Sequence, residues 1–130
     1  MIKVLVIEDN PSLRLLWRVG LEGHGMQVLE AGDGVRGLDL ARREHPDVIT
    51  LDVMMPGLDG WRVAEQLRAD RETRDIPIVF LTARAESCDR SRGLGLGAAE
   101  YITVPADPTE LPRRIESVLG RATPGSDPAT

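Results

Sequence analysis

Short apolar runs alternate with longer segments of helical periodicity along the whole chain. The runs occupy residues 2–7, 26–31, 47–52, 76–82 and 100–104. Three of them are almost continuous in valine, isoleucine and leucine, which is typical of strands covered on both faces in a parallel sheet. Strands that alternate with helices over short connections predict an α/β fold. We therefore expect a (βα)5 protein, a doubly wound five-stranded parallel sheet with helices on both faces.

The helical segments between these runs differ in quality. They are expected at 11–22, 34–45, 60–69, 85–96 and 108–119. The apolar face of the first is formed by Leu13, Leu16, Trp17 and Gly20. The fourth contains Gly93 and Gly95, each costing about 1 kcal/mol relative to alanine, so it is expected to be weak. The fifth has a capping pattern at Asp107 and Pro108, but Pro112 would then remove a hydrogen bond, so this helix is expected to start later or to kink.

Length and charge limit the classes of function. A chain of 130 residues is sufficient for one domain with its own core. The net charge of -5 argues against direct nucleic-acid binding by this domain, and no apolar run approaches the about 20 residues that span a bilayer. Met1 leads directly into a strand without a signal peptide, and Cys88 is the single cysteine. These features predict a cytoplasmic location without membrane contact.

The last residues of the chain are expected to lie outside the folded unit. Residues 121–130 lack apolar periodicity and contain Pro, Gly and Ser, which is typical of a flexible tail or the start of a linker. We therefore place the domain at residues 1–120.

Acidic and hydroxyl side chains follow three of the predicted strands. Glu8 and Asp9 follow the first strand, Asp52 ends the third, and Thr82 ends the fourth. In open α/β sheets the carboxyl ends of the strands line the working crevice. Three carboxylates meeting there raise one another's pKa unless a cation is present. Oxygen ligands of this kind suit a hard divalent ion, and Mg²⁺ is the leading candidate.

Four longer stretches carry a family resemblance. They read VLVIEDNPSLR, PDVITLDVMMPGLDGW, IPIVFLTARAE and GLGLGAAEYITVPADPTEL. In this order they resemble the receiver domain of bacterial two-component response regulators, over about residues 2–120. The resemblance implies the chemotaxis-regulator-like fold with strand order 2-1-3-4-5. It also implies a signalling module that is not an enzyme beyond phosphorylation and dephosphorylation of itself.

By this resemblance Asp52 is the phosphoacceptor, and the donor is a sensor histidine kinase or a phosphotransfer protein. Asp9, Asp52 and the backbone carbonyl of Met54 would bind Mg²⁺, and Glu8 would act through a water molecule. An aspartate oxygen attacks phosphorus effectively only when the charge between it and the phosphoryl oxygens is neutralised.

The resemblance also implies a switch in which Thr82 moves and Tyr101 rotates. Tyr101 alone is equally well explained as an aromatic that covers the sheet edge. A candidate homodimer face spans the fourth helix, the fifth strand and the fifth helix, with Arg90, Glu100, Glu110 and Arg114. A solvated charged face explains these four residues equally well.

One position departs from the family pattern. The family places a lysine before the proline that is here Pro105, and this chain has Val104. A charge-assisted hydrogen bond is worth about 1.5–3 kcal/mol, so altered switching is expected. The intact acidic residues favour a phosphorylated receiver. Val104 favours the alternative, a phosphorylation-independent protein-interaction module.

Overall fold

The structure is a computed structural model that describes residues 1–82, 91–92, 94–103 and 109–122. Its elements are β1 (Lys3–Ile7), α1 (Pro11–Glu22), β2 (Gln27–Ala31), α2 (Gly34–Glu44), β3 (Val48–Leu51), α3 (Gly60–Ala69), β4 (Ile78–Thr82), β5 (Glu100–Thr103) and α5 (Glu110–Ala122). Residues 91–92 and 94–95, within the expected fourth helix, are also helical. Leu96 lies in a turn, and residues 85–90 and 93 lie outside the described residues.

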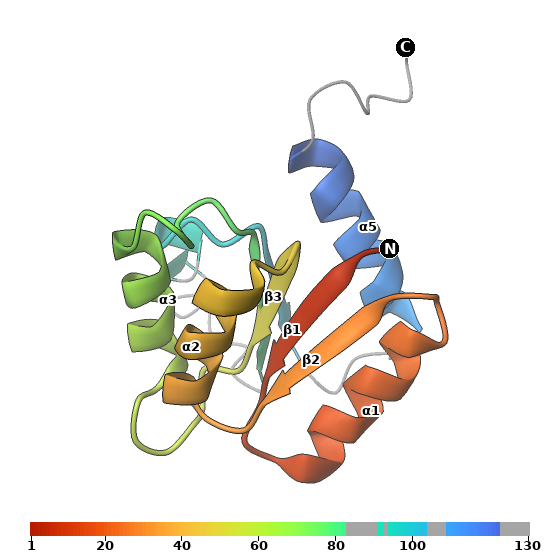
Figure 1. Ribbon diagram of the computed structural model, residues 1–130, viewed down its shortest axis with the longest axis horizontal. Helices are drawn as coiled ribbons and strands as arrows, with labels where there is room; N and C mark the ends of the chain where they lie inside the picture. Colours follow the sequence, from red (N-terminus) through yellow and green to blue (C-terminus); the bar gives the residue numbers. More distant parts are fainter. Residues whose placement is uncertain (83–90, 93, 104–108, 123–130) are drawn as a thin grey trace.

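The five strands form one parallel sheet in the order β2-β1-β3-β4-β5, as predicted. Helices α2 and α3 cover one face of the sheet, and α1 and α5 cover the other (Figure 1). Successive strand residues point to opposite faces, so Leu5 and Ile7 enter one core while Val4 and Val6 enter the other. The doubly wound α/β fold is therefore confirmed.

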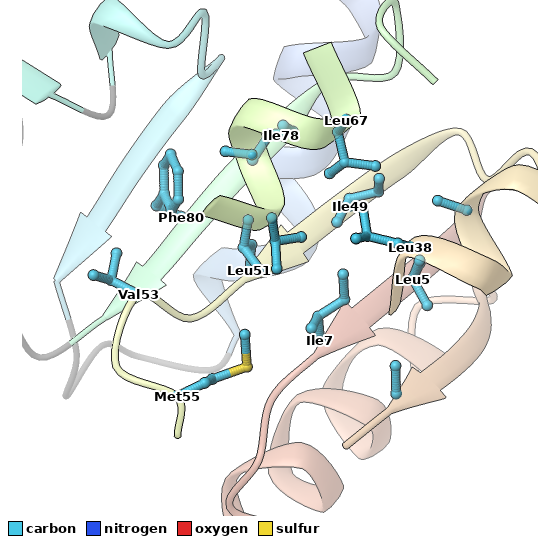
Figure 2. Packing of buried hydrophobic residues seen from close by; sticks show 14 of the residues in the cluster. Leu5, Ile7, Leu38, Ile49, Leu51, Val53, Met55, Leu67, Ile78 and Phe80 are labelled. Atoms are coloured by element: carbon cyan, nitrogen blue, oxygen red, sulfur yellow. The ribbon is translucent and has the colours of Figure 1, made fainter. Parts of the chain in front are cut away.

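The core beneath α2 and α3 contains the larger set of buried side chains. Its members include Leu5, Ile7, Leu38, Ile49, Leu51, Val53, Met55, Leu67, Ile78 and Phe80 (Figure 2). The ring of Trp61, at the start of α3, lies 5.1 Å from the ring of Phe80 on β4. The guanidinium carbon of Arg92 lies 4.8 Å from the Trp61 ring, within the range of a cation–π contact. The helical residues near 92 are thus joined to α3.

The core beneath α1 and α5 contains the second tryptophan. Its buried residues include Val4, Val6, Trp17, Leu21, Val48, Val79, Leu111, Ile115 and Val118. The two tryptophans of the chain therefore lie on opposite faces of the sheet. Among the described residues, none of the helices combines the length and the apolar character that crossing a bilayer requires.

Helix α5 starts later than residue 108 and ends beyond the expected residue 119. It begins at Glu110, so Pro112 is its third residue, where a missing N–H removes no intrahelical hydrogen bond. The later start that Pro112 predicted is therefore confirmed. The helix continues to Ala122, so the first two residues of the expected tail are helical. The predicted caps at Asp107 and Pro108, and residues 123–130, lie outside the described residues.

Two buried threonines differ in their hydrogen bonding, and replacing each of them by valine is expected to change the stability in opposite directions. Thr50 Oγ1 has no hydrogen-bond partner within the described part of the chain, whereas Thr73 Oγ1 donates to the Leu67 carbonyl at 2.7 Å. A buried polar group without a partner costs about 1–3 kcal/mol. Thr50→Val is therefore expected to raise the free energy of unfolding by about 1 kcal/mol, and Thr73→Val to lower it by about 1 kcal/mol. Urea unfolding of both variants measures these changes, and a loss of stability in Thr50→Val would contradict the first.

Candidate functional site

Three carboxylates converge where β1 and β3 end. Ile7 pairs with Leu51 in the sheet, so Glu8 and Asp52 leave adjacent strands together. The Asp52 N–H donates to the Ile7 carbonyl at 3.2 Å, which continues the strand pairing by one residue. Carboxylate oxygens of Glu8, Asp9 and Asp52 all lie within 4.8 Å of one another. The convergence that the strand ends predicted is present.

Glu8 is the buried member of this trio. Its side chain is only 3% exposed, whereas Asp9 and Asp52 are partly buried. The pKa of Glu8 is raised to about 8, chiefly because burial removes hydration and in addition because of the neighbouring charge of Asp52, against a lowering hydrogen bond from Asn10. Without a cation, Glu8 therefore holds a proton at neutral pH. The donor set is entirely oxygen and carries excess negative charge, so it fits a hard divalent cation.

The loop after β3 orients Asp52. The Met54 N–H donates to Asp52 Oδ1 at 3.1 Å, and the Gly60 N–H donates to the Val53 carbonyl at 3.1 Å. The Asp59 side chain caps α3 by accepting from the Arg62 N–H at 2.9 Å. The start of α3 thus fixes the backbone that carries the Asp52 carboxylate.

The other predicted site residues are described in full, by their backbone alone or not at all. Thr82 is the last residue of β4, and Tyr101 pairs with Phe80 from β5. The predicted switch roles of the Thr82 and Tyr101 side chains lie outside what the structure describes. So do the side chain of Glu100 and all of Arg90, Val104 and Pro105. Glu110 is exposed at the start of α5, and Arg114 is partly buried one turn later.

One residue beside the site escaped the sequence analysis. Arg14 Nη1, from α1, donates to the Glu8 carbonyl at 2.8 Å. Its position five residues after Asp9, at the start of an expected helix, was the available signal. Its second partner is Glu30 on β2, which lies 3.4 Å from Arg14 Nε and which no local pattern indicates.

Comparison with known proteins decides the family. The sequence profile of the response regulator receiver domain matches residues 4–116. This chain belongs to the receiver-domain family. Receiver domains are signalling modules of two-component response regulators, in agreement with the resemblance read from the sequence.

Two curated proteins place this receiver domain among its relatives. It is 45% identical over 119 residues to the probable transcriptional regulator ycf27 of Porphyridium aerugineum, covering 92% of this chain and 48% of that protein. It is 40% identical over 119 residues to protein PilH of Pseudomonas aeruginosa, covering 92% of this chain and 98% of that protein. The receiver domain therefore spans about half the length of the ycf27 regulators it matches and nearly all of PilH.

A solved receiver domain has the same architecture. The receiver domain of the Francisella response regulator 1452 superposes with a TM-score of 0.87 at 30% identity, covering 95% of this chain and 100% of that one. The fold assigned from strand order is thus shared with an experimental receiver structure.

The protonation of Glu8 gives this receiver domain a testable pH dependence. Because the folded-state pKa of about 8 lies above the ordinary value of 4.5, the folded state holds an extra proton between these values, and stability falls as the pH rises through this window. Each full pKa unit corresponds to about 1.4 kcal/mol. In a chelator, Glu8→Gln is expected to remove this fall, as measured by urea unfolding from about pH 5 to about pH 8.5.

The control for this prediction is Glu65→Gln, because Glu65 is exposed on α3 away from the acidic trio. It should retain the pH dependence of the wild type. Equal pH dependence in the wild type and Glu8→Gln would show that Glu8 ionises normally in the folded protein.

Proposed function

We propose that this receiver domain accepts a phosphoryl group on Asp52 from a sensor histidine kinase or a phosphotransfer protein in a Mg²⁺-dependent reaction. The observation that carries the proposal is the approach of the Glu8, Asp9 and Asp52 carboxylates to within 4.8 Å of one another. The membership of the chain in the receiver family supports the same role.

The residues of the site fit the proposed cofactor. Asp9, Asp52 and the Met54 carbonyl would hold Mg²⁺, and Glu8 would act through a water molecule. When bound, Mg²⁺ supplies positive charge between the carboxylate and the incoming phosphoryl oxygens. The Met54 N–H donates to Asp52 Oδ1 at 3.1 Å, which orients the carboxylate.

The reaction needs no other group from the protein to form or break a bond. A carboxylate oxygen of Asp52 attacks the phosphorus of a phosphohistidine, and a P–O bond forms as the P–N bond breaks. The released imidazole takes up a proton from water. The β3–α3 loop and the buried strand end keep the Asp52 backbone fixed while this happens.

Intact mass measurement tests the proposal. Incubation with a small phosphodonor and Mg²⁺ is expected to add the mass of one phosphoryl group to the wild type. Asp52→Asn should remain unmodified, as should the wild type in a chelator. If no donor produces the heavier species in the wild type, the proposed function is wrong.

Altered switching is the finer part of the proposal, and it rests on Val104. Thr82 and Tyr101 are the proposed switch residues, and the candidate homodimer face is that of Arg90, Glu100, Glu110 and Arg114. A valine cannot supply the ammonium that other receivers place before this proline. The same valine is the feature that favours the second candidate, an interaction module that works without phosphorylation.

Restoring the cation tests the role of Val104. A charge-assisted hydrogen bond of about 1.5–3 kcal/mol corresponds to about tenfold or more in an equilibrium or a rate. Val104→Lys is therefore expected to lengthen the phosphoryl lifetime by about tenfold and to strengthen phosphorylation-dependent dimerisation. Val104→Met, which adds length without charge, is the control. Identical lifetimes and dimerisation in the wild type and Val104→Lys would contradict this account of the departure.

A further inference from the structure

A guanidinium from α1 holds the turn that carries Glu8 and Asp9. Arg14 Nη1 donates to the Glu8 carbonyl at 2.8 Å, and the Arg14 side chain is 24% exposed. The contact is to the backbone of Glu8 rather than to its carboxylate. Arg14 therefore restrains the position of the chain without occupying the carboxylate oxygens.

Glu30, on β2, forms an ion pair with Arg14 that orients its guanidinium group. Glu30 Oε1 lies 3.4 Å from Arg14 Nε, and Glu30 Oε2 accepts from Arg18 Nη1 at 2.9 Å. Arg18 Nε also donates to Glu22 Oε1 at 3.2 Å on the same helix. The carboxylate of Glu30 thus binds two arginines, of which only Arg14 has a recorded contact with the turn at the acidic site.

Hydrogen bonds at three polar groups of Glu8 fix the turn after β1. The Glu8 N–H donates to the Ala31 carbonyl at 3.0 Å, and Glu8 Oε2 accepts from the Asn10 N–H at 3.1 Å. The Glu8 carbonyl accepts the third hydrogen bond, from Arg14. The carboxylates of Asp9 and Asp52 repel each other, and an outward movement of the short turn bearing Asp9 would relieve this repulsion. The charged hydrogen bond from Arg14 opposes that movement.

We propose that Arg14, directed by Glu30, is a positioning residue that holds the β1–α1 turn so that Glu8 and Asp9 are preorganised for a divalent cation. This inference rests on the proposed function, because it assigns Arg14 a role at the same site. Residues that do not bind the metal but orient its ligands typically lower the metal affinity by about 10–100-fold when they are removed.

Mg²⁺ titration by calorimetry tests the inference with a matched pair of variants. Arg14→Met keeps the aliphatic stem but loses every donor, and it is expected to raise the Kd for Mg²⁺ by about tenfold. Arg18→Met loses the other arginine of Glu30 but no contact with Glu8, and it should leave the Kd within about twofold of the wild type. Equal affinities in the wild type and Arg14→Met, or an equal loss in Arg18→Met, would overturn the inference.

A second measurement needs no metal. In a chelator, amide hydrogen exchange at Asn10 should be faster in Arg14→Met than in the wild type and unchanged in Arg18→Met, because of these two arginines it is Arg14 that donates to the turn. Unchanged exchange at Asn10 in Arg14→Met would overturn the inference. If Arg14→Met does not fold, Arg14→Lys replaces it. Arg14 contacts Glu8 and Glu30 through two separate nitrogens, Nη1 and Nε, whereas lysine has one nitrogen at the end of its side chain. The Kd of Arg14→Lys should therefore still exceed that of the wild type, and an equal Kd would overturn the inference.

The outcomes separate the inference from the proposed function. A wild type without saturable Mg²⁺ binding overturns the proposed function, and the role of Arg14 falls with it. If the wild type binds Mg²⁺ saturably but with the same Kd as Arg14→Met, only the role of Arg14 is overturned.

Discussion

Gly60→Ala is expected to lower the free energy of unfolding by about 3 kcal/mol, at the upper end of the cost of overpacking. A Cβ atom at Gly60 would clash with the Asp52 carbonyl oxygen and lie 2.7 Å from the Val53 Cα. Both are backbone atoms, so no side-chain rotation relieves the contact. The start of α3 or the chain at Asp52 must shift. Urea unfolding measures the loss, and intact mass after phosphodonor treatment should show reduced modification of Asp52.

Gly120→Ala is the matched control, because a Cβ atom at Gly120 in α5 meets nothing within 4 Å. Alanine is favoured over glycine inside a helix by up to about 1 kcal/mol, so this variant should be equal to or more stable than the wild type. A Gly60→Ala variant as stable as the wild type would show that the β3–α3 loop yields easily. The loop would then not fix Asp52 in the way described above.

Arg68→Ala is expected to cost about 3 kcal/mol of stability, because one guanidinium serves four backbone carbonyls. Arg68 donates to Arg74 at 2.8 Å, Ile76 at 2.9 Å, Leu96 at 3.2 Å and Gly97 at 3.2 Å. These acceptors precede β4 and β5, so one side chain joins α3 to the starts of both strands. Burial lowers the pKa of Arg68, which indicates that its charge depends on these acceptors for solvation.

Two variants on the same helix sharpen this prediction. Arg68→Lys keeps the charge but cannot span the four carbonyls, so chemical denaturation should show it recovering less than half of the lost stability. Arg62→Ala removes an exposed arginine of α3 and should change stability by less than about 0.5 kcal/mol. An Arg68→Ala variant within about 1 kcal/mol of the wild type would rule out a structural role of this size.

Most of the sheet was predictable because its strands are apolar on both faces. The strand order and the helices Pro11–Glu22 and Gly60–Ala69 agree with the expectations from the sequence. The fourth strand starts later than expected, at Ile78, because the Ile76 N–H turns back to the Thr73 carbonyl. Such a turn satisfies the backbone locally, and apolar composition alone does not show it.

Helix α1 shows the limit of periodicity. Leu16 was expected on its buried face but is 43% exposed, whereas Leu21 is fully buried. This helix carries apolar residues around most of its circumference, including exposed Leu15 and Val19. When several stripes are apolar, tertiary packing rather than spacing decides which one faces the sheet.

The carboxylates of the candidate site were predictable and their supports were not. Glu8, Asp9 and Asp52 follow adjacent parallel strands, so their convergence is a consequence of the fold. The link between Arg14 and Glu30 joins helix α1 to the next strand of the chain, β2. No spacing rule contains that information, because the pair exists only after the sheet and the helix have packed.

The placement of the two tryptophans gives the folded protein two separate optical reporters. Trp61 contacts Phe80 on one face of the sheet and lies under the Arg92 guanidinium, whereas Trp17 belongs to the core on the other face. The fluorescence of an indole ring responds to a cation close to it. A displacement of Arg92 should therefore change the fluorescence of Trp61 and leave that of Trp17 unchanged. In a Trp17→Phe variant, the remaining tryptophan fluorescence therefore reports on the helical residues near 92. In a Trp61→Phe variant, it reports on the core on the other face of the sheet.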